Sequence, residues 1–266
     1  MIAVILRTIR DRWKMLLAIC VIGMGTQLMY ISLFPSFKTS QINYDDLMKQ
    51  MPEAFKKVIN MESFSMDTIE KYLTMEMYSM FWLILTIIFC LSLGGTGIAA
   101  EIERETVVQS AAQPISRTGI FIGKWLASAK LFTIFNIVIN AAVVPLCHLF
   151  NVTYLPDHFL AVTVMGELFG LALLSLSLAV SAFMSDKGRV QMIMAGAVLV
   201  MYVMNIVAAI KPAIDKLKYA SLFHYFDPNK ALIQGRYDIT AIIVFGGLIV
   251  IGFAIGWWRF SKRDLV

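Results

Sequence analysis

Six long apolar runs alternate with polar segments along the 266 residues of the chain. Each run has about 20 residues or more, which is the length that an α-helix needs to cross roughly 30 Å of hydrocarbon. Runs of this kind are typical of membrane-spanning helices and exclude an outer-membrane barrel. The pattern therefore predicts an all-α integral membrane protein in which residues 1–266 form a single transmembrane domain. The six expected spans are residues 15–34, 77–100, 120–150, 159–184, 192–210 and 239–258.

The longest polar segment, residues 35–75, separates the first two spans. Pro35 is expected to end the first helix, because a proline cannot donate the hydrogen bond that a helix interior requires. Apolar residues then recur at helical spacing, and Pro52 and Ser65 suit the beginnings of short helices. The last of these helices is expected to continue into the second span. We interpret the segment as an extracellular helical region that either handles substrate or rests on the bilayer surface.

A short acidic segment, residues 101–118, follows the second span. Residues 101–112 favour a helix, and Pro114 is expected to end it because the residue before a proline avoids the helical conformation. The charged residues do not gather on one helical face, and acidic groups gain nothing from the negative inner leaflet. A cytosolic protein partner explains these charges better than the bilayer does. The alternative is a solvated connector whose charges only keep it in water.

Several polar residues interrupt the apolar spans. Asn136 and Asn140 lie in the third span, and Glu167 lies in the fourth. A charged side chain near the bilayer centre costs about 2.5–3.5 kcal/mol on insertion scales, so Glu167 needs a partner, water or a proton. The three residues are candidates for lining a substrate path, or they hydrogen-bond to neighbouring helices. Lys124 and Lys130 are expected to extend toward the inner face along their apolar stems.

Composition and charge agree with a membrane protein. The chain is 59% hydrophobic and 15% charged, whereas soluble domains are nearer half apolar and a quarter charged. The four segments on one side carry eleven Lys and Arg against six acidic residues; the other side has ten against eleven, spread over many more residues. The positive-inside rule therefore predicts a multi-pass protein of the plasma membrane with both termini in the cytosol. The net charge of +5 reflects these inner loops and suggests no nucleic-acid partner.

The sequence contains no constellation typical of an enzyme. Gly119-x-x-x-Gly123-Lys124 lacks the spacing and the terminal Ser or Thr of a phosphate-binding loop. The three cysteines are scattered within apolar runs, and the three histidines lie far apart, so neither set has metal-ligand spacing. We therefore assign no catalytic and no metal-binding residue. Transport remains, with its energy supplied by an ion gradient or by a separate ATPase.

Several short motifs carry a resemblance to a known family. The acidic residues after the second span are followed by Gln113-Pro114-Ile115-Ser116-Arg117 and by Gly119…Gly123-Lys124. Together with Leu47…Met51-Pro52-Glu53-Ala54-Phe55 in the first polar segment and the C-terminal Phe260-Ser261-Lys262-Arg263-Asp264-Leu265, this pattern resembles the ABC-2 family of ATP-binding-cassette permease subunits. The resemblance covers essentially the whole chain. Thr106 departs from it, because the family often has Gly there.

The resemblance implies a mode of action. Two such subunits, identical or different, would form a pore in the lipid bilayer, and two cytosolic nucleotide-binding ATPase subunits would dock on their inner helices. ATP and Mg²⁺ would be bound by the ATPase, so no cofactor is expected in this chain. Residues 101–118 would couple ATP hydrolysis to transport. The implied coupling residues are Glu101, Glu103, Arg104, Glu105, Pro114, Ser116 and Arg117.

Two other classes of protein compete with an ABC exporter permease. A gradient-driven transporter or channel is typically marked by intramembrane ionisable relays or paired broken helices, and this chain offers Glu167, Lys130 and little else. A membrane-anchored assembly or sensor protein would need no coupling segment. For an exporter, a lipid, a peptide antibiotic, a polysaccharide and a small ion all remain open as substrates.

Overall fold

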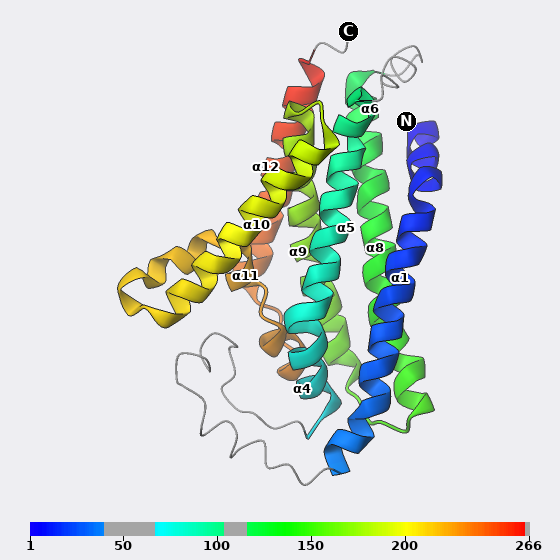
Figure 1. Ribbon diagram of the computed structural model, residues 1–266, viewed down its shortest axis with the longest axis vertical. Helices are drawn as coiled ribbons and strands as arrows, with labels where there is room; N and C mark the ends of the chain where they lie inside the picture. Colours follow the sequence, from blue (N-terminus) through cyan, green and yellow to red (C-terminus); the bar gives the residue numbers. More distant parts are fainter. Residues whose placement is uncertain (40–66, 104–115, 264–266) are drawn as a thin grey trace.

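The computed structural model of the protein describes residues 1–39, 67–103 and 116–263. Within these ranges the chain forms helices and no strand, so the predicted all-α class is confirmed. Six helices are long and apolar enough to cross a membrane. The long helices run side by side, and α1 begins at the same end of the bundle at which α12 ends (Figure 1). We call this end the inner end, after the predicted topology, and the opposite end the outer end.

The principal helices follow one another along the chain with short elements between them. The long ones are α1 (Ile2–Thr39), α5 (Trp82–Gly97), α8 (Arg117–Leu149), α9 (Pro156–Phe183), α10 (Lys187–Ile210) and α12 (Ile239–Ser261). The short ones are α4 (Ile69–Leu73), the π-helix η1 (Thr74–Phe81), α6 (Ala99–Glu103), the 3₁₀ helix η2 (Pro212–Ala220), α11 (Leu222–Tyr225) and the π-helix η3 (Asn229–Ile233).

The first helix is longer than the hydropathy pattern predicts. Helix α1 begins at Ile2, and Pro35 lies inside it, so the prediction that Pro35 ends the helix is wrong. Tertiary packing explains the difference, because Phe34 is buried and its ring lies 5.5 Å from that of Tyr72. This contact holds the last turns in place despite the hydrogen bond that the proline removes. Pro145 likewise lies inside α8.

The second span begins before the expected boundary. Helices α4, η1 and α5 follow one another directly from Ile69 to Gly97, as expected for a helix that continues into the span. Thr68 caps the start, since its side chain accepts a hydrogen bond from the backbone N–H of Lys71 at 3.4 Å. The helix expected to be capped by Ser65 therefore begins at Ile69 with Thr68 as its cap. The short helix predicted at Pro52 lies outside the described residues.

Helix α9 lies at the centre of the bundle and packs against α5, α8 and α12. Its Phe169 is buried among aromatic rings from other elements, including Trp82 and Phe245. Gly170 permits the close approach of α8, because any side chain at this position would collide with the Phe132 ring. The helices that cross over α9 are thus held by aromatic packing and by close backbone contact.

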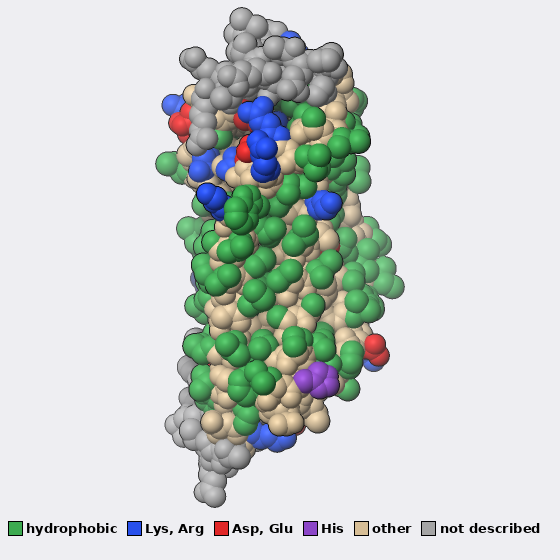
Figure 2. Space-filling view, turned by 90° about the vertical axis from the view of Figure 1, so that its right-hand side faces the viewer, with side chains coloured by type: hydrophobic (Ala, Val, Ile, Leu, Met, Phe, Trp, Pro, Cys, Tyr) green, Lys and Arg blue, Asp and Glu red, His purple; other side chains and the backbone are tan. Residues whose placement is uncertain are grey.

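The outer surface of the long helices is apolar. Helices α10 and α12 bury little of their length within the chain and expose large side chains such as Leu199, Val203, Ile243 and Val250. Figure 2 shows hydrophobic side chains over the middle of one face, with most Lys, Arg, Asp and Glu toward its upper end. This distribution fits a bundle surrounded by hydrocarbon at mid-height and by water near its ends.

Candidate functional site

Glu101 forms an ion pair within the chain at the inner end. The Nζ atom of Lys124 on α8 lies 2.5 Å from a carboxylate oxygen of Glu101 on α6, and it also donates to the backbone oxygen of Gly97 at 2.6 Å. The Lys124 side chain is only 4% exposed, whereas that of Glu101 is 29% exposed. Lys124 is therefore buried between helices at the inner end of the bundle. It ties the end of α5 and the start of α6 to the first turns of α8.

Glu103, the second residue of the predicted coupling set, also binds within the chain. Its carboxylate accepts the backbone N–H of Lys187, at the start of α10, at 3.0 Å. The first turn of a helix has N–H groups without helical partners, and it attracts negative charge. Asp186 caps the same helix through the N–H of Arg189 at 2.8 Å. Two carboxylates therefore fix the beginning of α10.

Ser116 and Arg117 begin α8. The Ser116 hydroxyl accepts the N–H of Gly119 at 3.1 Å, which is the usual bond of a helix N-cap. Arg117 donates to the backbone oxygen of Arg263 at 2.6 Å, beyond the end of α12. The start of α8 is therefore joined to the C-terminal part of the chain. The remaining predicted coupling residues, Arg104, Glu105 and Pro114, lie outside the described residues.

Arg263 makes a group of contacts that the sequence did not reveal. Its guanidinium donates to the backbone oxygens of Ala182 and Met184 at 2.9 and 2.8 Å, and to the Ser185 hydroxyl at 2.7 Å. These acceptors lie at the end of α9 and in the turn before α10. Burial and the nearby Arg259 lower the pKa of Arg263 from its ordinary value, and arginine stays charged at any physiological pH.

The three candidate substrate-path residues belong to one hydrogen-bonded network between α8 and α9. The Asn136 amide nitrogen donates to Glu167 and to the backbone oxygen of Thr163, both at 2.9 Å. Asn140 donates to the Asn136 side chain at 2.9 Å and accepts a hydrogen bond of 2.6 Å from Tyr78. The network therefore runs from η1 through α8 to α9, within helices that are long and apolar enough to cross a membrane.

Glu167 lies at the edge of this network and is half-buried. Its second carboxylate oxygen lies within hydrogen-bond distance of the Thr133 hydroxyl, whose single proton it shares with the backbone oxygen of Ala129, 3.0 Å from that hydroxyl. Both oxygens of Glu167 thus have partners, which lowers the cost of placing the carboxyl group inside the membrane. The contacts fit the packing interpretation, while the substrate path stays a prediction.

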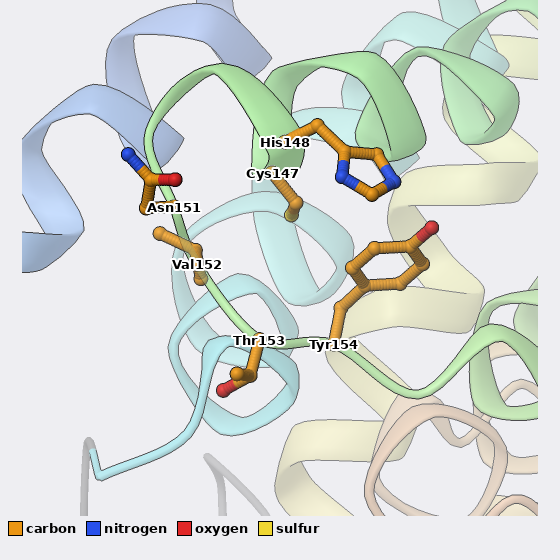
Figure 3. Close-up of a pocket in the computed structure, with 6 residues that line it drawn as sticks. All are labelled: Cys147, His148, Asn151, Val152, Thr153 and Tyr154. Atoms are coloured by element: carbon orange, nitrogen blue, oxygen red, sulfur yellow. The ribbon is translucent and has the colours of Figure 1, made fainter.

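A shallow hollow of about 360 Å³ lies at the outer end, where α8 turns into α9 (Figure 3). The His148 and Tyr154 rings meet edge to face, with centroids 5.9 Å apart, and Cys147 is buried. Asn151 adopts φ = 53°, a left-handed conformation that asparagine tolerates and that tightens the turn. In the part of the chain that the structure describes, no group of three His, Cys, Asp or Glu side chains is placed to hold a metal.

Sequence reasoning missed the partners of the predicted residues. Tyr78, Thr133 and Lys187 were not singled out, and Arg263 was noted only as part of the C-terminal motif, although each of the four contacts a predicted residue. The sequence did give a signal for the partner of Lys124, because a lysine within an apolar span needs a counter-ion or access to water. For the others, residue type and spacing carry no signal of the contact across helices.

The helices of the structure indicate the class of protein, and the sequence then identifies the family. A bundle of six membrane-spanning helices, with its charges tied together at one end, is a multi-pass membrane protein. The sequence matches the family described as ABC-2 family transporter protein over residues 5–265. The chain therefore belongs to the ABC-2 transporter family, which confirms the predicted resemblance. Among curated proteins, none matches the sequence.

Membership of this family fixes the kind of role that the chain has. ABC-2 permeases are the membrane components of transport systems and generally work with ATP-binding partners. The chain is accordingly an ABC transporter permease. The description applies to nearly the whole sequence, including the segments that lie outside the described residues.

Proposed function

We propose that this chain is the transmembrane subunit of an ATP-binding-cassette exporter in the plasma membrane, powered by separate cytosolic ATPase subunits. Membership of the ABC-2 family over residues 5–265 supports the proposal. ATP and Mg²⁺ are bound by the ATPase, and the permease itself carries out no catalysis. A second permease subunit, either identical or different, completes the translocation path, and both termini face the cytosol.

Residues 101–118 couple the ATPase to the bundle in this proposal. The observation that carries it is that both described ends of the segment are fastened to long helices. Glu101 and Glu103 fasten the first end to α8 and α10, and Arg117 fastens the second end to the chain beyond α12. A segment anchored in this way transmits a push from the cytosol to several helices.

The contacts divide the seven coupling residues by role. Glu101, Glu103, Ser116 and Arg117 fix the ends of the segment within the chain. Arg104 and Glu105 then remain to pair with charged groups of the ATPase, and Pro114 shapes the turn back into α8. Charge pairs at the edge of such an interface contribute little energy but set the orientation of the partners.

The substrate path in this proposal passes the network of Asn136, Asn140 and Glu167. Amide and carboxyl groups at mid-membrane offer hydrogen bonds to a polar part of a substrate, as intramembrane polar residues commonly do. All three lie on the facing sides of α8 and α9, and they share hydrogen bonds. This placement supports a common role for the three residues.

Co-purification tests the proposal. The tagged chain, purified in mild detergent from membranes of cells that also express its ATPase, is expected to carry vanadate-sensitive ATPase activity. Glu105→Lys reverses a charge of the coupling segment and is expected to release the ATPase. Asp157→Lys is the matched control, since it makes the same change on an exposed residue at the outer end of the bundle.

Two results would contradict the proposal. If the wild-type chain carries no ATPase and moves solute only down an ion gradient, a gradient-driven transporter is the better assignment. If Glu105→Lys and Asp157→Lys release the ATPase equally, the docking site does not involve residues 101–118. Membrane insertion of each variant is checked by its amount in the washed membrane fraction.

A further inference from the structure

A closed series of polar contacts joins the inner ends of the helices. Four links make up this series, which we call the inner ring. The first link is the ion pair of Glu101 on α6 with Lys124 on α8, and the second is the hydrogen bond from Arg117 on α8 to the backbone oxygen of Arg263, beyond α12. In the third link the Arg263 side chain binds the end of α9 and the turn before α10, at Ala182, Met184 and Ser185. The fourth link is the hydrogen bond from the N–H of Lys187, at the start of α10, back to Glu103 on α6.

The inner ring surrounds a small apolar core of its own. Five buried residues form a cluster separate from the main core of the bundle: Ile98, Ile120, Phe121, Ala182 and Phe260. They come from the α5–α6 junction, α8, α9 and α12, which are elements that the ring also joins. Apolar burial holds these helix ends together, and the polar contacts around it fix their relative orientation.

Arg263 closes the ring where the last carbonyl groups of α9 lack helical hydrogen-bond donors. The backbone oxygens of Ala182 and Met184 lie at the end of α9, where carbonyl groups lack helical donors and attract a cation. The planar guanidinium reaches both oxygens and the Ser185 hydroxyl together, which the single ammonium group of a lysine does not do. The adjacent Lys262 carries the same charge but lies over the Trp258 ring, 5.0 Å from its centroid.

Both flanks of residues 104–115 end on this ring. Glu103 precedes these residues and binds the start of α10, whereas Arg117 follows them and binds the oxygen of Arg263. We propose that Arg263 is a positioning residue for coupling, which holds the inner ends of α8, α9, α10 and α12 as one unit so that they move together. This inference rests on the proposed function of residues 101–118 as the coupling segment.

The geometry explains why one residue has this effect. A push on the coupling segment reaches α8 through Lys124 and Arg117, and it reaches α10 through Glu103. Without the Arg263 guanidinium, the turn between α9 and α10 is no longer tied to α12 or, through the Arg263 backbone, to α8. The same push then displaces helix ends separately, and part of the movement is lost before it reaches the outer end.

Nucleotide-dependent labelling of the intact complex tests the inference without a known substrate. A cysteine is introduced at Lys211, an exposed residue at the outer end of α10, in the wild-type chain and in Arg263→Gln, Arg263→Lys and Lys262→Gln backgrounds. The complex with its ATPase is placed in lipid nanodiscs. The rate of reaction with an impermeant maleimide is measured with and without a non-hydrolysable ATP analogue.

The expected results separate the role of Arg263 from a loss of charge or of folding. The nucleotide changes the labelling rate in the wild type and in Lys262→Gln, and this change is lost in Arg263→Gln while the ATPase still co-purifies. Arg263→Lys loses it in part, because it keeps the charge but not the fork of donors. This variant also serves as the test if Arg263→Gln does not insert.

Three results would overturn the inference, and one of them would also overturn the proposed function. If the nucleotide changes the labelling rate in Arg263→Gln and Arg263→Lys as much as in the wild type, the ring is not needed for coupling. Equal loss in Lys262→Gln would assign the effect to charge alone. A wild type that holds no ATPase, or whose labelling does not respond to nucleotide, would remove the coupling role of residues 101–118 itself.

Discussion

Lys124 carries a deeply buried charge at the inner end, and Glu101 compensates for that charge. Breaking a buried ion pair by removing one partner typically costs about 3–5 kcal/mol, because the other charge stays buried and unpaired. Here the Glu101 side chain is 29% exposed, so water compensates for part of the loss. We therefore expect Glu101→Ala to lower the free energy of unfolding by about 2–3 kcal/mol.

A double substitution separates the pair from the surrounding packing. Lys124→Met removes the charge and keeps an apolar stem of similar length, so Glu101→Ala combined with Lys124→Met is expected to regain most of the lost stability. Thermal unfolding in detergent measures both variants. Glu103→Gln, on the same short helix, is the control, because its amide oxygen still accepts the Lys187 N–H. A double variant as unstable as Glu101→Ala would show that the pair is not what stabilises this region.

Glu167 is expected to tolerate replacement by glutamine. The Gln oxygen accepts from Asn136, and its NH₂ group donates to Thr133, whose hydroxyl already donates to the Ala129 oxygen. Glu167→Gln should therefore change the free energy of unfolding by less than about 1 kcal/mol, whereas Glu167→Leu should cost about 1–3 kcal/mol by leaving polar partners unsatisfied. Thermal unfolding of the two variants gives the comparison. Equal damage by Gln and Leu would mean that the ionised carboxylate itself is required.

The polar residues inside the spans illustrate what a sequence reveals at this scale. Glu167, Asn136 and Asn140 are visible because polar groups are costly in hydrocarbon, so each must have a partner. The identity of the partner is not visible, since it depends on how each helix is rotated about its axis. Tyr78 reaches Asn140 from η1 across 62 positions in sequence, and nothing in its local context indicates this.

At the scale of single elements, the start of α12 depends on one aspartate. Asp238 accepts the N–H groups of Thr240 and Ala241 at 3.0 and 3.3 Å, and its other oxygen lies 2.8 Å from Lys230 Nζ. Asp238→Ala is expected to cost about 1 kcal/mol, as for other helix caps. Asp238→Asn keeps an oxygen for the cap and loses the ion pair, which is worth less than about 1 kcal/mol because Lys230 is half-exposed.

The contribution of this ion pair depends on pH in a known direction. The hydrogen bond from Lys230 holds the pKa of Asp238 below its ordinary value, and the bond to Asp238 raises the pKa of Lys230. The stabilisation is complete above the unfolded Asp pKa of about 3.9 and is lost as the pH falls through the lower folded value. It is equally complete below the unfolded Lys pKa of about 10.4 and is lost as the pH rises through the higher folded value.

Unfolding midpoints in detergent test both statements about Asp238. The difference between wild type and Asp238→Asn should stay constant from pH 5 to pH 9 and shrink at more acidic pH. Asp215→Asn, which breaks a similar pair with the nearby Lys218, provides the comparison at a site without a helix cap. A difference that grows as the pH falls below 5 would contradict the assigned pKa directions.

Helix boundaries were less predictable than the number of helices. Six spans follow from the length of the apolar runs, and the described part of the chain has six helices long and apolar enough to cross a membrane. The ends shift because packing extends a helix beyond its apolar run, as Phe34 does by holding the last turns of α1 past Pro35. A proline therefore marks an end only where no tertiary contact supports the next turn.

At the scale of the whole molecule, several charged side chains make contacts that join helix ends at the inner end. Glu101 and Glu103 were predicted to face a partner, and Arg117 was predicted to shape the turn back into the third span. In the structure all three bind to other parts of the same chain. This arrangement fastens both described flanks of residues 104–115 to the helix bundle. The sequence indicates the acidic cluster, and only the fold indicates which of its members are already paired.

The orientation of the whole molecule in the membrane is predicted from the higher density of Lys and Arg in the segments on one side, and it can be measured directly. The native cysteines Cys20, Cys90 and Cys147 are all buried, so they give little background in a labelling experiment. A cysteine at the exposed Lys216, in η2, should react with an impermeant maleimide added to intact cells. A cysteine at the exposed Arg189 should react only after the cells are opened, and it leaves the Asp186 cap intact because the contact uses the backbone N–H. Reaction of the Arg189→Cys variant in intact cells, with protection of Lys216→Cys, would place the termini outside the cell and the coupling segment out of reach of any cytosolic ATPase.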